Sequence, residues 1–217
     1  MTVAAVILVP EPAAALALAD GEPVLRRVCQ AAWSGGAIPT VAVGSQLTEE
    51  ARDAVGDLTV TFAEPAATEP HGIAWFARGL LTAATTVTDT TAALLWPVRQ
   101  AWVDPETVTS LVEAHGAWTD AIIRPAYAGQ PGFPILIPAA LADRLAALSG
   151  QHGVEAVEAL VAAGVPLRQI EMGDPGIVHD ISTPRADLPS YQGPPQPAAG
   201  PPPDWNEALA RSANPPA

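Results

Sequence analysis

The sequence predicts a three-layer α/β/α fold built on a Rossmann-like, mostly parallel β-sheet. Short β-branched apolar runs alternate with longer segments of helical periodicity through most of the chain. The first run, Val3 to Val9, has no polar alternation, which is typical of a parallel strand covered on both faces. Strands that alternate with helices of this length imply right-handed βαβ crossovers, and therefore a sheet whose strands mostly run in one direction.

The first elements follow from local signals. A loop is expected from Pro10 to Gly21, and Pro23 then starts a helix whose apolar residues lie on one stripe. A later helix begins at Asp104, with a proline in its first turn, and ends at about His115, before Gly116. Further strands are expected at 40–43, 58–62, 92–95, 121–124, 133–138 and 167–171, and further helices at 48–55, 73–84, 139–147 and 154–163.

The C-terminal composition differs from the rest of the chain. From Pro189 onward Pro, Ala, Gly and Gln dominate, and such a segment buries too little apolar area to offset the entropy of ordering. We therefore expect one domain over residues 1–188 and a Pro-rich, flexible tail over 189–217. Trp205 and Leu209 have helical spacing after Asp204, so this segment is either a docking helix for a protein partner or a mobile stretch with an exposed tryptophan.

The composition excludes several function classes. The formal net charge of -13 opposes binding to nucleic acid or anionic lipid, because no basic patch compensates for it. No apolar run reaches the roughly 20 residues of a membrane helix, and no signal peptide is evident, so a cytoplasmic location is expected. Cys29 is the only cysteine and is expected to pack in the core. All ten basic residues are arginines, so the chain has no lysine.

Three segments, in order, carry a family resemblance. Residues 93–107 (ALLWPVRQAWVDPET) combine an apolar strand, a turn between prolines and a capped helix, and residues 124–134 (RPAYAGQPGFP) and 180–188 (DISTPRADL) follow them. Over Thr2 to Leu188 the chain resembles the MobA-like NTP transferase family, nearest to the molybdenum-cofactor cytidylyltransferases. This resemblance implies the nucleotide-diphospho-sugar/NTP-transferase type of fold.

The resemblance also implies a glycine-rich phosphate loop after the first strand, from which this chain departs. The corresponding loop, Leu8 to Gly21, has no glycine before its last residue and no basic side chain. Pro10 and Pro12 remove two backbone N–H donors, and Glu11 places a negative charge where phosphates would lie. We expect this loop to repel a triphosphate.

The metal site that the resemblance implies is altered as well. Arg99 stands where the family has an aspartate, and a guanidinium cannot ligate a divalent cation. In residues 180–188, which resemble the last motif of the family, Asp180 keeps the first acid and Ser182 replaces the second. Two hypotheses remain open: Arg99 forms an ion pair with Asp180 in place of a metal, or Arg99 points to solvent. Arg26 and Arg27 are expected on the solvated face of the first helix.

A second ligand pocket is the other candidate site. In the family the segment around residues 129–134 helps to accept the second substrate, and the residues here suit a bulky ligand. His179, beside Asp180, lies at the mouth of the predicted site. The candidate residues of this pocket are Trp102, Gly129, Gly132, Phe133, Pro134 and His179.

The altered motifs favour a nucleotidyltransferase-like protein that has lost NTP transfer, a pseudoenzyme acting as a non-catalytic binding or accessory protein. Its ligand could be pterin-like, or its partner an intact paralogue. The alternative is an active Mg²⁺-dependent cytidylyl- or guanylyltransferase, acting on a molybdenum-cofactor-type substrate with an atypical phosphate loop. The first reading needs no cofactor, and the second needs Mg²⁺ with a nucleoside triphosphate.

Overall fold

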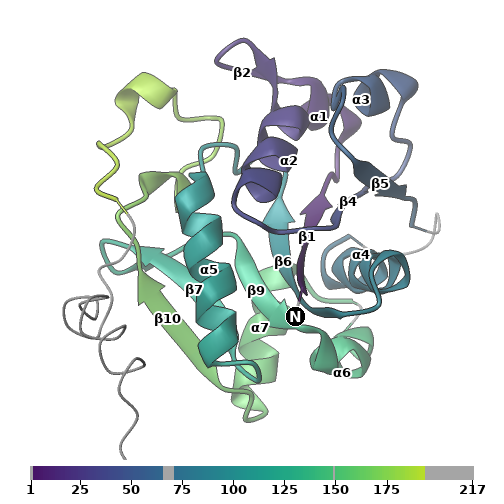
Figure 1. Ribbon diagram of the computed structural model, residues 1–217, viewed down its shortest axis with the longest axis vertical. Coiled ribbons are helices and arrows are strands. Elements are labelled where there is room, and N and C mark those ends of the chain that lie inside the picture. The colour runs from purple at the N-terminus through teal and green to yellow at the C-terminus, as the bar shows by residue number, and fades with distance from the viewer. Residues whose placement is uncertain (1, 66–70, 149, 194–217) are drawn as a thin grey trace, which may run out of the picture.

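The central sheet is mixed but mostly parallel, as predicted (Figure 1). The computed structural model describes residues 2–65, 71–148 and 150–193. The strand order is β10-β7-β9-β6-β1-β4-β5, and only β9 on this path runs antiparallel to its neighbours, β6 and β7. The strands are β1 (Thr2–Leu8), β4 (Thr40–Val43), β5 (Val60–Ala63), β6 (Thr90–Pro97), β7 (Ile122–Tyr127), β9 (Ile135–Pro138) and β10 (Leu167–Glu171), with the short β8 (Gln130–Pro131) paired to β7.

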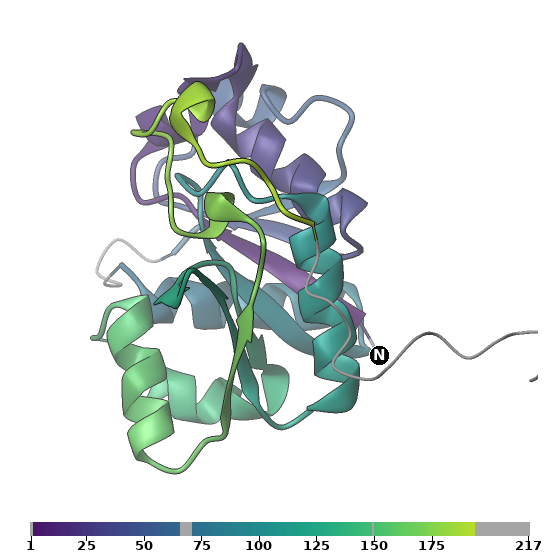
Figure 2. The same ribbon diagram turned by 90° about the vertical axis from the view of Figure 1, so that its left-hand side faces the viewer.

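Helices cover both faces of this sheet and give the predicted three layers (Figures 1 and 2). One layer contains α2 (Val24–Ser34) and α5 (Pro105–Ala117). The opposite layer contains α4 (Ile73–Thr86), α6 (Ala142–Ala146) and α7 (Gly153–Ala162). The short α3 (Glu49–Asp53) packs near the first layer, with Thr48 as its N-cap. Three-residue 3₁₀ turns lie at Ala139–Leu141, Pro175–Ile177 and Arg185–Asp187.

Strand β1 lies in the middle of both hydrophobic cores. Val3, Ala5 and Ile7 belong to the cluster beneath α2 and α5, whereas Val6 and Leu8 belong to the cluster beneath α4 and α7. All five side chains are buried. A strand covered on both faces needs apolar residues at every position, which explains the run without alternation.

The structure corrects four expected boundaries. The expected loop from Pro10 to Gly21 contains α1 (Pro12–Leu16) and a small hairpin of β2 (Leu18–Ala19) and β3 (Glu22–Pro23), because Pro12 can occupy a first helical turn and an alanine run follows it. Helix α5 passes through Gly116 to Ala117. The expected helix over 139–147 starts with a 3₁₀ turn, and β9 begins only at Ile135, because Pro134 has no N–H for the sheet.

The first residues of the predicted tail lie against the domain. The Tyr191 hydroxyl donates to Glu106 Oε2 at 2.8 Å, and the backbone N–H of Gln192 donates to the carbonyl of Gly173 at 2.9 Å. The rest of the tail, with the proposed docking segment around Trp205, lies outside the described residues.

A buried carboxylate joins the segment that follows β10 to the start of α5. Asp174 is 2% exposed, and its oxygens accept hydrogen bonds from the Asp104 N–H, the Thr107 hydroxyl and the Gly176 N–H at 2.8–2.9 Å. Burial raises the pKa of Asp174, although these three hydrogen bonds partly oppose the rise. The carboxylate therefore satisfies backbone donors at the start of α5 and in the 3₁₀ turn Pro175–Ile177.

Two expectations from composition can be compared with the structure. Cys29 is buried, and its burial raises the pKa of the thiol to about 12, which fits a packing role. Over the ranges that the structure describes, none of the helices has the length and apolar character needed to cross a membrane.

Gly79 sets how closely α4 approaches the sheet. A Cβ atom at this position would lie 2.9 Å from Val43 Cγ2 and even closer to Val6 Cγ1, on the two strands below. Real Cβ atoms do not pack at such distances, so a side chain here would push α4 away from β1 and β4. The glycine is thus required by packing in the core.

We therefore expect Gly79→Ala to destabilise the protein, although alanine favours helix more than glycine by about 1 kcal/mol. Overpacking should lower the free energy of unfolding by about 1–3 kcal/mol, measured by urea denaturation. Leu81→Ala, in the same helix at a side chain that is 68% exposed, is the control and should change stability by no more than about 0.5 kcal/mol. A stabilised Gly79→Ala variant would contradict the packing argument.

Candidate functional site

The candidate site lies where the chain changes the side of β1 on which it adds strands to the sheet. The parallel strands β1 and β6 are neighbours, and their last residues, Leu8 and Pro97, are paired in register. From β1 the chain continues to β4 and β5 on one side, whereas β6 lies on the other. Open α/β sheets bind their ligands at such a switch point, outside the carboxyl ends of the strands. Two cavities open here, and Pro97 lines both.

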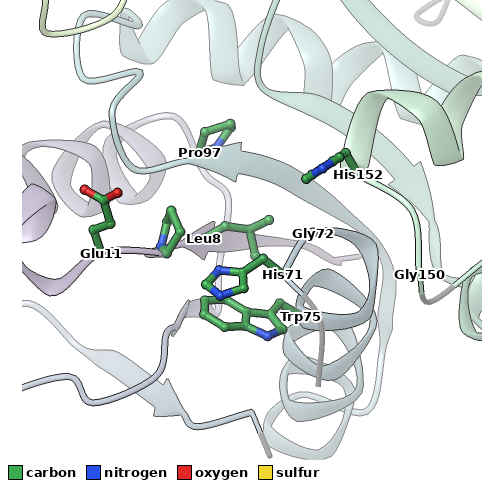
Figure 3. A pocket seen from close by; sticks show the side chains of 9 residues that line it. Leu8, Glu11, His71, Gly72, Trp75, Pro97, Gly150 and His152 are labelled. Carbon is green, nitrogen blue, oxygen red and sulfur yellow. The ribbon is translucent and has the colours of Figure 1, made fainter. Parts of the chain in front are cut away.

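The first cavity has a volume of about 660 Å³ and contains the start of the altered phosphate loop (Figure 3). Pro10 and Glu11, which were predicted for the degenerate nucleotide site, both line this cavity. Glu11 supplies a carboxylate, and neither lysine nor arginine is among the lining residues. A triphosphate would therefore meet the negative charge of Glu11 here with no lysine or arginine to compensate for it. The lining residues are Leu8, Pro10, Glu11, His71, Gly72, Trp75, Pro97, Gly150 and His152.

Sequence reasoning missed the aromatic wall of this cavity. The imidazole of His71 stacks on the indole of Trp75, with ring centroids 4.3 Å apart and planes inclined by 25° (Figure 3). Their spacing of four residues, with His71 just before the N-cap of α4 and Trp75 in its first turn, is a signal that could have suggested the pair. His152 comes from the N-terminus of α7, and no sequence pattern links it to His71; the two helix starts meet because the Ile73 N–H donates to the carbonyl of Gln151 at 3.3 Å.

The second cavity has a volume of about 350 Å³ and unites residues that the sequence had assigned to two separate sites. Arg99, Asp180 and Ser182 were predicted for a degenerate metal site, and Phe133 and His179 for a second-ligand pocket. All five line this one cavity, because residues 178–183, here called the closing segment, lie against the turn after β6. The lining residues are Pro97, Arg99, Gln100, Phe133, Val178, His179, Asp180, Ser182 and Thr183.

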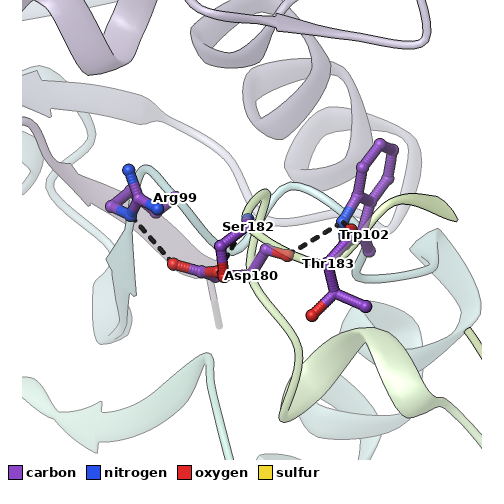
Figure 4. A network of polar contacts seen from close by, with 5 residues as sticks. All are labelled: Arg99, Trp102, Asp180, Ser182 and Thr183. Carbon is purple, nitrogen blue, oxygen red and sulfur yellow. Dashed lines mark hydrogen bonds and ion pairs between the residues drawn. The ribbon is translucent and has the colours of Figure 1, made fainter. Parts of the chain in front are cut away.

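Arg99 and Asp180 form the ion pair that the first of the two hypotheses expected, and Arg99 does not simply point to solvent (Figure 4). Arg99 Nε lies 2.8 Å from Asp180 Oδ2, and the Ile181 N–H donates to the Arg99 carbonyl at 3.0 Å. The other oxygen, Asp180 Oδ1, accepts from the backbone N–H and the hydroxyl of Ser182. Both carboxylate oxygens are therefore engaged within the protein.

These contacts shift the pKa of Asp180. Partial burial alone would raise it, but the hydrogen bonds from Ser182 and then from Arg99 outweigh burial, and the pKa falls below its ordinary value. Asp180 therefore remains a carboxylate at neutral pH.

The donor set does not fit the divalent metal that the resemblance implies. Arg99 is a cation, Asp180 already has a partner at each oxygen, and the Ser182 hydroxyl donates to Asp180. Throughout residues 2–65, 71–148 and 150–193, no cluster of three or more His, Cys, Asp or Glu side chains could hold a metal ion.

The remaining predicted pocket residues line neither cavity; they are Trp102, Gly129, Gly132 and Pro134. Trp102 Nε1 donates to the carbonyls of Asp180 and Thr183 at 3.1 and 3.0 Å, so this indole holds the closing segment in place (Figure 4). A Cβ atom on Gly132 would collide with the Ile177 carbonyl, whereas the Gly129 N–H donates to Glu171 at 3.1 Å.

The two arginines of α2 are also committed elsewhere. Arg26 pairs with Glu22 and Asp57 at 3.2 and 3.0 Å. Arg27 Nε donates to the Ala101 carbonyl at 2.9 Å, and its guanidinium lies 5.1 Å from the centre of the Trp102 ring. Both side chains are partly buried, unlike the solvated positions expected from sequence, and neither lines a cavity of the candidate site.

Comparison with known proteins places this architecture in a class, the nucleotidyltransferase fold. A manganese complex of Rv0371c from Mycobacterium tuberculosis is 21% identical, with a TM-score of 0.60 over 79% of this chain and 89% of that one. A nucleotidyl transferase from Methanothermobacter thermautotrophicus is 18% identical, with a TM-score of 0.68 over 83% and 91% of the two chains. The 2-C-methyl-D-erythritol 4-phosphate cytidylyltransferase of Thermus thermophilus is 20% identical, with a TM-score of 0.64 over 85% and 95%.

The family itself is shown by sequence. The model of the MobA-like NTP transferase domain matches residues 13–166, and the chain belongs to this family. No curated protein sequence matches the chain.

The ion pair leads to a pH prediction. Because the pKa of Asp180 is lower in the folded than in the unfolded chain, the unfolded chain takes up the proton first as the pH falls. The stability advantage of the native chain over Asp180→Asn should be complete above about pH 5 and decline as the pH falls below about 4. Since the pair is partly exposed, we expect a change of about 1 kcal/mol in urea unfolding. An advantage that does not vary with pH would contradict the lowered pKa.

Proposed function

We propose that this protein is a MobA-like pseudoenzyme that has lost NTP transfer and acts as a non-catalytic binding or accessory protein. The observation that carries the proposal is the Arg99–Asp180 ion pair, at the place where the family resemblance puts a metal-holding aspartate. A guanidinium there supplies a positive charge but no ligand, so the ion pair would replace the metal rather than hold it.

The altered phosphate loop supports the same proposal independently. Transfer of a nucleotidyl group requires neutralisation of several phosphate charges and stabilisation of the leaving pyrophosphate. The first cavity offers the Glu11 carboxylate instead, and Pro10 provides no N–H. The chain has no lysine, and Arg26 and Arg27 are engaged with other groups.

The location and the partner belong to the proposal too. We infer a cytoplasmic protein that binds a protein partner, such as an intact paralogue, through the Pro-rich tail around Trp205.

The tail should be tested by removing residues after Gly193, because residues 189–193 lie against the domain. Partner binding, measured by co-purification with the paralogue, should be lost both in this truncation and in Trp205→Ala; unchanged binding in both variants would remove the tail from the proposal.

An active enzyme is the second candidate, and two observations favour it. The chain belongs to a family of NTP transferases, and a 660 Å³ cavity lies at the switch point of its sheet. In this reading the protein is a Mg²⁺-dependent cytidylyl- or guanylyltransferase, acting on a molybdenum-cofactor-type substrate through an atypical phosphate loop.

Thermal melting separates the two candidates, because a ligand of the native state raises the melting temperature by mass action. The purified protein is melted with CTP, GTP, ATP or UTP, each with and without Mg²⁺. We expect no shift at millimolar nucleotide, because Glu11 repels the phosphates. A Mg²⁺-dependent rise with one nucleotide, followed by pyrophosphate release in a transfer assay, would establish the enzyme instead.

Replacing the arginine should partly restore cation binding. Arg99→Asp places a second carboxylate near Asp180, and two carboxylates attract a divalent cation. We expect millimolar Mn²⁺ to raise the melting temperature of Arg99→Asp but not that of the native protein. The matched control is Arg185→Asp, which breaks the 3.0 Å pair with Asp20 away from both cavities. An equal response of the control would mean that any added surface acid suffices, and that the position of Arg99 has no special relation to a metal.

A further inference from the structure

The second cavity contains hydrogen-bonding groups that the protein itself does not use. Arg99 and Gln100 are consecutive residues in the turn after β6, and both line this cavity. Each has one part of its side chain bonded to the protein and another part without a partner. Such a division is expected where a side chain is held in place to contact a ligand.

The free edge of Arg99 is suited to a carboxylate. Among the described residues, the guanidinium of Arg99 has one hydrogen-bond partner, Asp180, to which it donates through Nε. The edge formed by Nη1 and Nη2 therefore remains open, and 47% of the side chain is exposed. Two parallel N–H donors on that edge match the two oxygens of a carboxylate, and Asp180 holds the guanidinium from the other side.

Gln100 adds a group that requires a donor. The residue as a whole is 8% exposed, and its Nε2 donates to the Ile177 carbonyl at 3.1 Å. Its Oε1, in contrast, is buried and has no hydrogen-bond partner among the residues that the structure describes. Gln100 lines the cavity, and a buried acceptor without a donor is unfavourable, so a ligand whose O–H or N–H reaches this atom after a small shift of the amide gains affinity by satisfying it.

Charge and size limit the ligand further. Asp180 already balances the positive charge of Arg99, so the several charges of a nucleotide would meet no net positive charge here, whereas a single carboxylate can still bond to the open Nη edge. Phe133 and Val178 supply apolar wall, and the volume of about 350 Å³ is at the lower end for small-molecule pockets.

We propose that the second cavity binds a small monocarboxylate that also carries a hydroxyl or amino group, that is, a hydroxy acid or an amino acid with an apolar side chain. The carboxylate contacts the Nη edge of Arg99, the donor group satisfies Gln100 Oε1, and the apolar part packs on Phe133. The proposal deepens the proposed function and rests on it, because a cavity that still held a metal and a triphosphate could not accept this ligand.

Isothermal titration with matched pairs of acids tests the proposal on the full-length protein. The pairs are mandelate with phenylacetate and 3-phenyllactate with 3-phenylpropionate, which differ only by the hydroxyl. We expect at least one hydroxy acid to bind with a Kd below about 1 mM and at least tenfold more tightly than its partner without the hydroxyl. No binding by any of the four acids, or tighter binding of inorganic phosphate, would overturn the proposal.

Variants then assign the two contacts. Arg99→Gln should weaken the hydroxy acid at least tenfold, and Arg99→Lys should also weaken it, because an ammonium lacks the two-pronged edge. Gln100→Leu should reduce the affinity ratio within a pair to about 1, a readout that a general loss of stability does not mimic; Gln100→Met serves if the leucine variant does not fold. Arg185→Gln is the control and should leave both affinities unchanged. Unchanged binding in Arg99→Gln would place the ligand elsewhere and overturn the assignment.

The two proposals fail in distinguishable ways. Pyrophosphate release from a Mg²⁺-nucleotide complex would refute the loss of transfer whatever the titrations show. Absence of both pyrophosphate release and carboxylate binding would refute only the ligand and leave a binding role for a protein partner.

Discussion

The parallel pairing of β1 with β6 is the constraint on which the rest of the molecule depends. Because β1 is covered on both faces, its side chains divide between two cores and hold a helical layer on each side of the sheet. The same pairing brings Leu8 and Pro97 side by side at the carboxyl edge, and both cavities open there. The position of the site thus follows from the sheet, whereas its chemistry depends on the loops that leave it.

Those loops show how a family site can change charge without a change of fold. Glu11 makes the first cavity acidic where a phosphate ligand would need basic groups, and the pair of Arg99 with Asp180 makes the second nearly neutral. The closing segment keeps its place because Trp102 binds two of its carbonyls. The backbone of the site and the groups exposed on it are therefore determined by different residues.

The sequence predicted the sheet and the second cavity better than the first. Strands such as β1 and β10 are recognisable from their own residues, and the short spacing of Arg99 from Pro97 and of Ser182 from Asp180 sets these groups at fixed places in their turns. The wall of the first cavity was missed because His71 and His152 come from distant helix starts that meet only through tertiary packing. Helix α1 was missed because five residues, the first of them a proline, give too weak a periodic signal.

The hydrogen bond between Gln192 and Gly173 fixes the position of the last described residues, just beyond the end of β10. Trp205 follows Gly193 by 12 residues, so even a fully extended chain keeps it within roughly 43 Å of that point. A partner held by this tryptophan would be tethered to the sheet edge at a high local concentration. Weak contacts between such a partner and the cavities would then be intramolecular, and they could be occupied even where the separate surfaces would not associate at cellular concentrations.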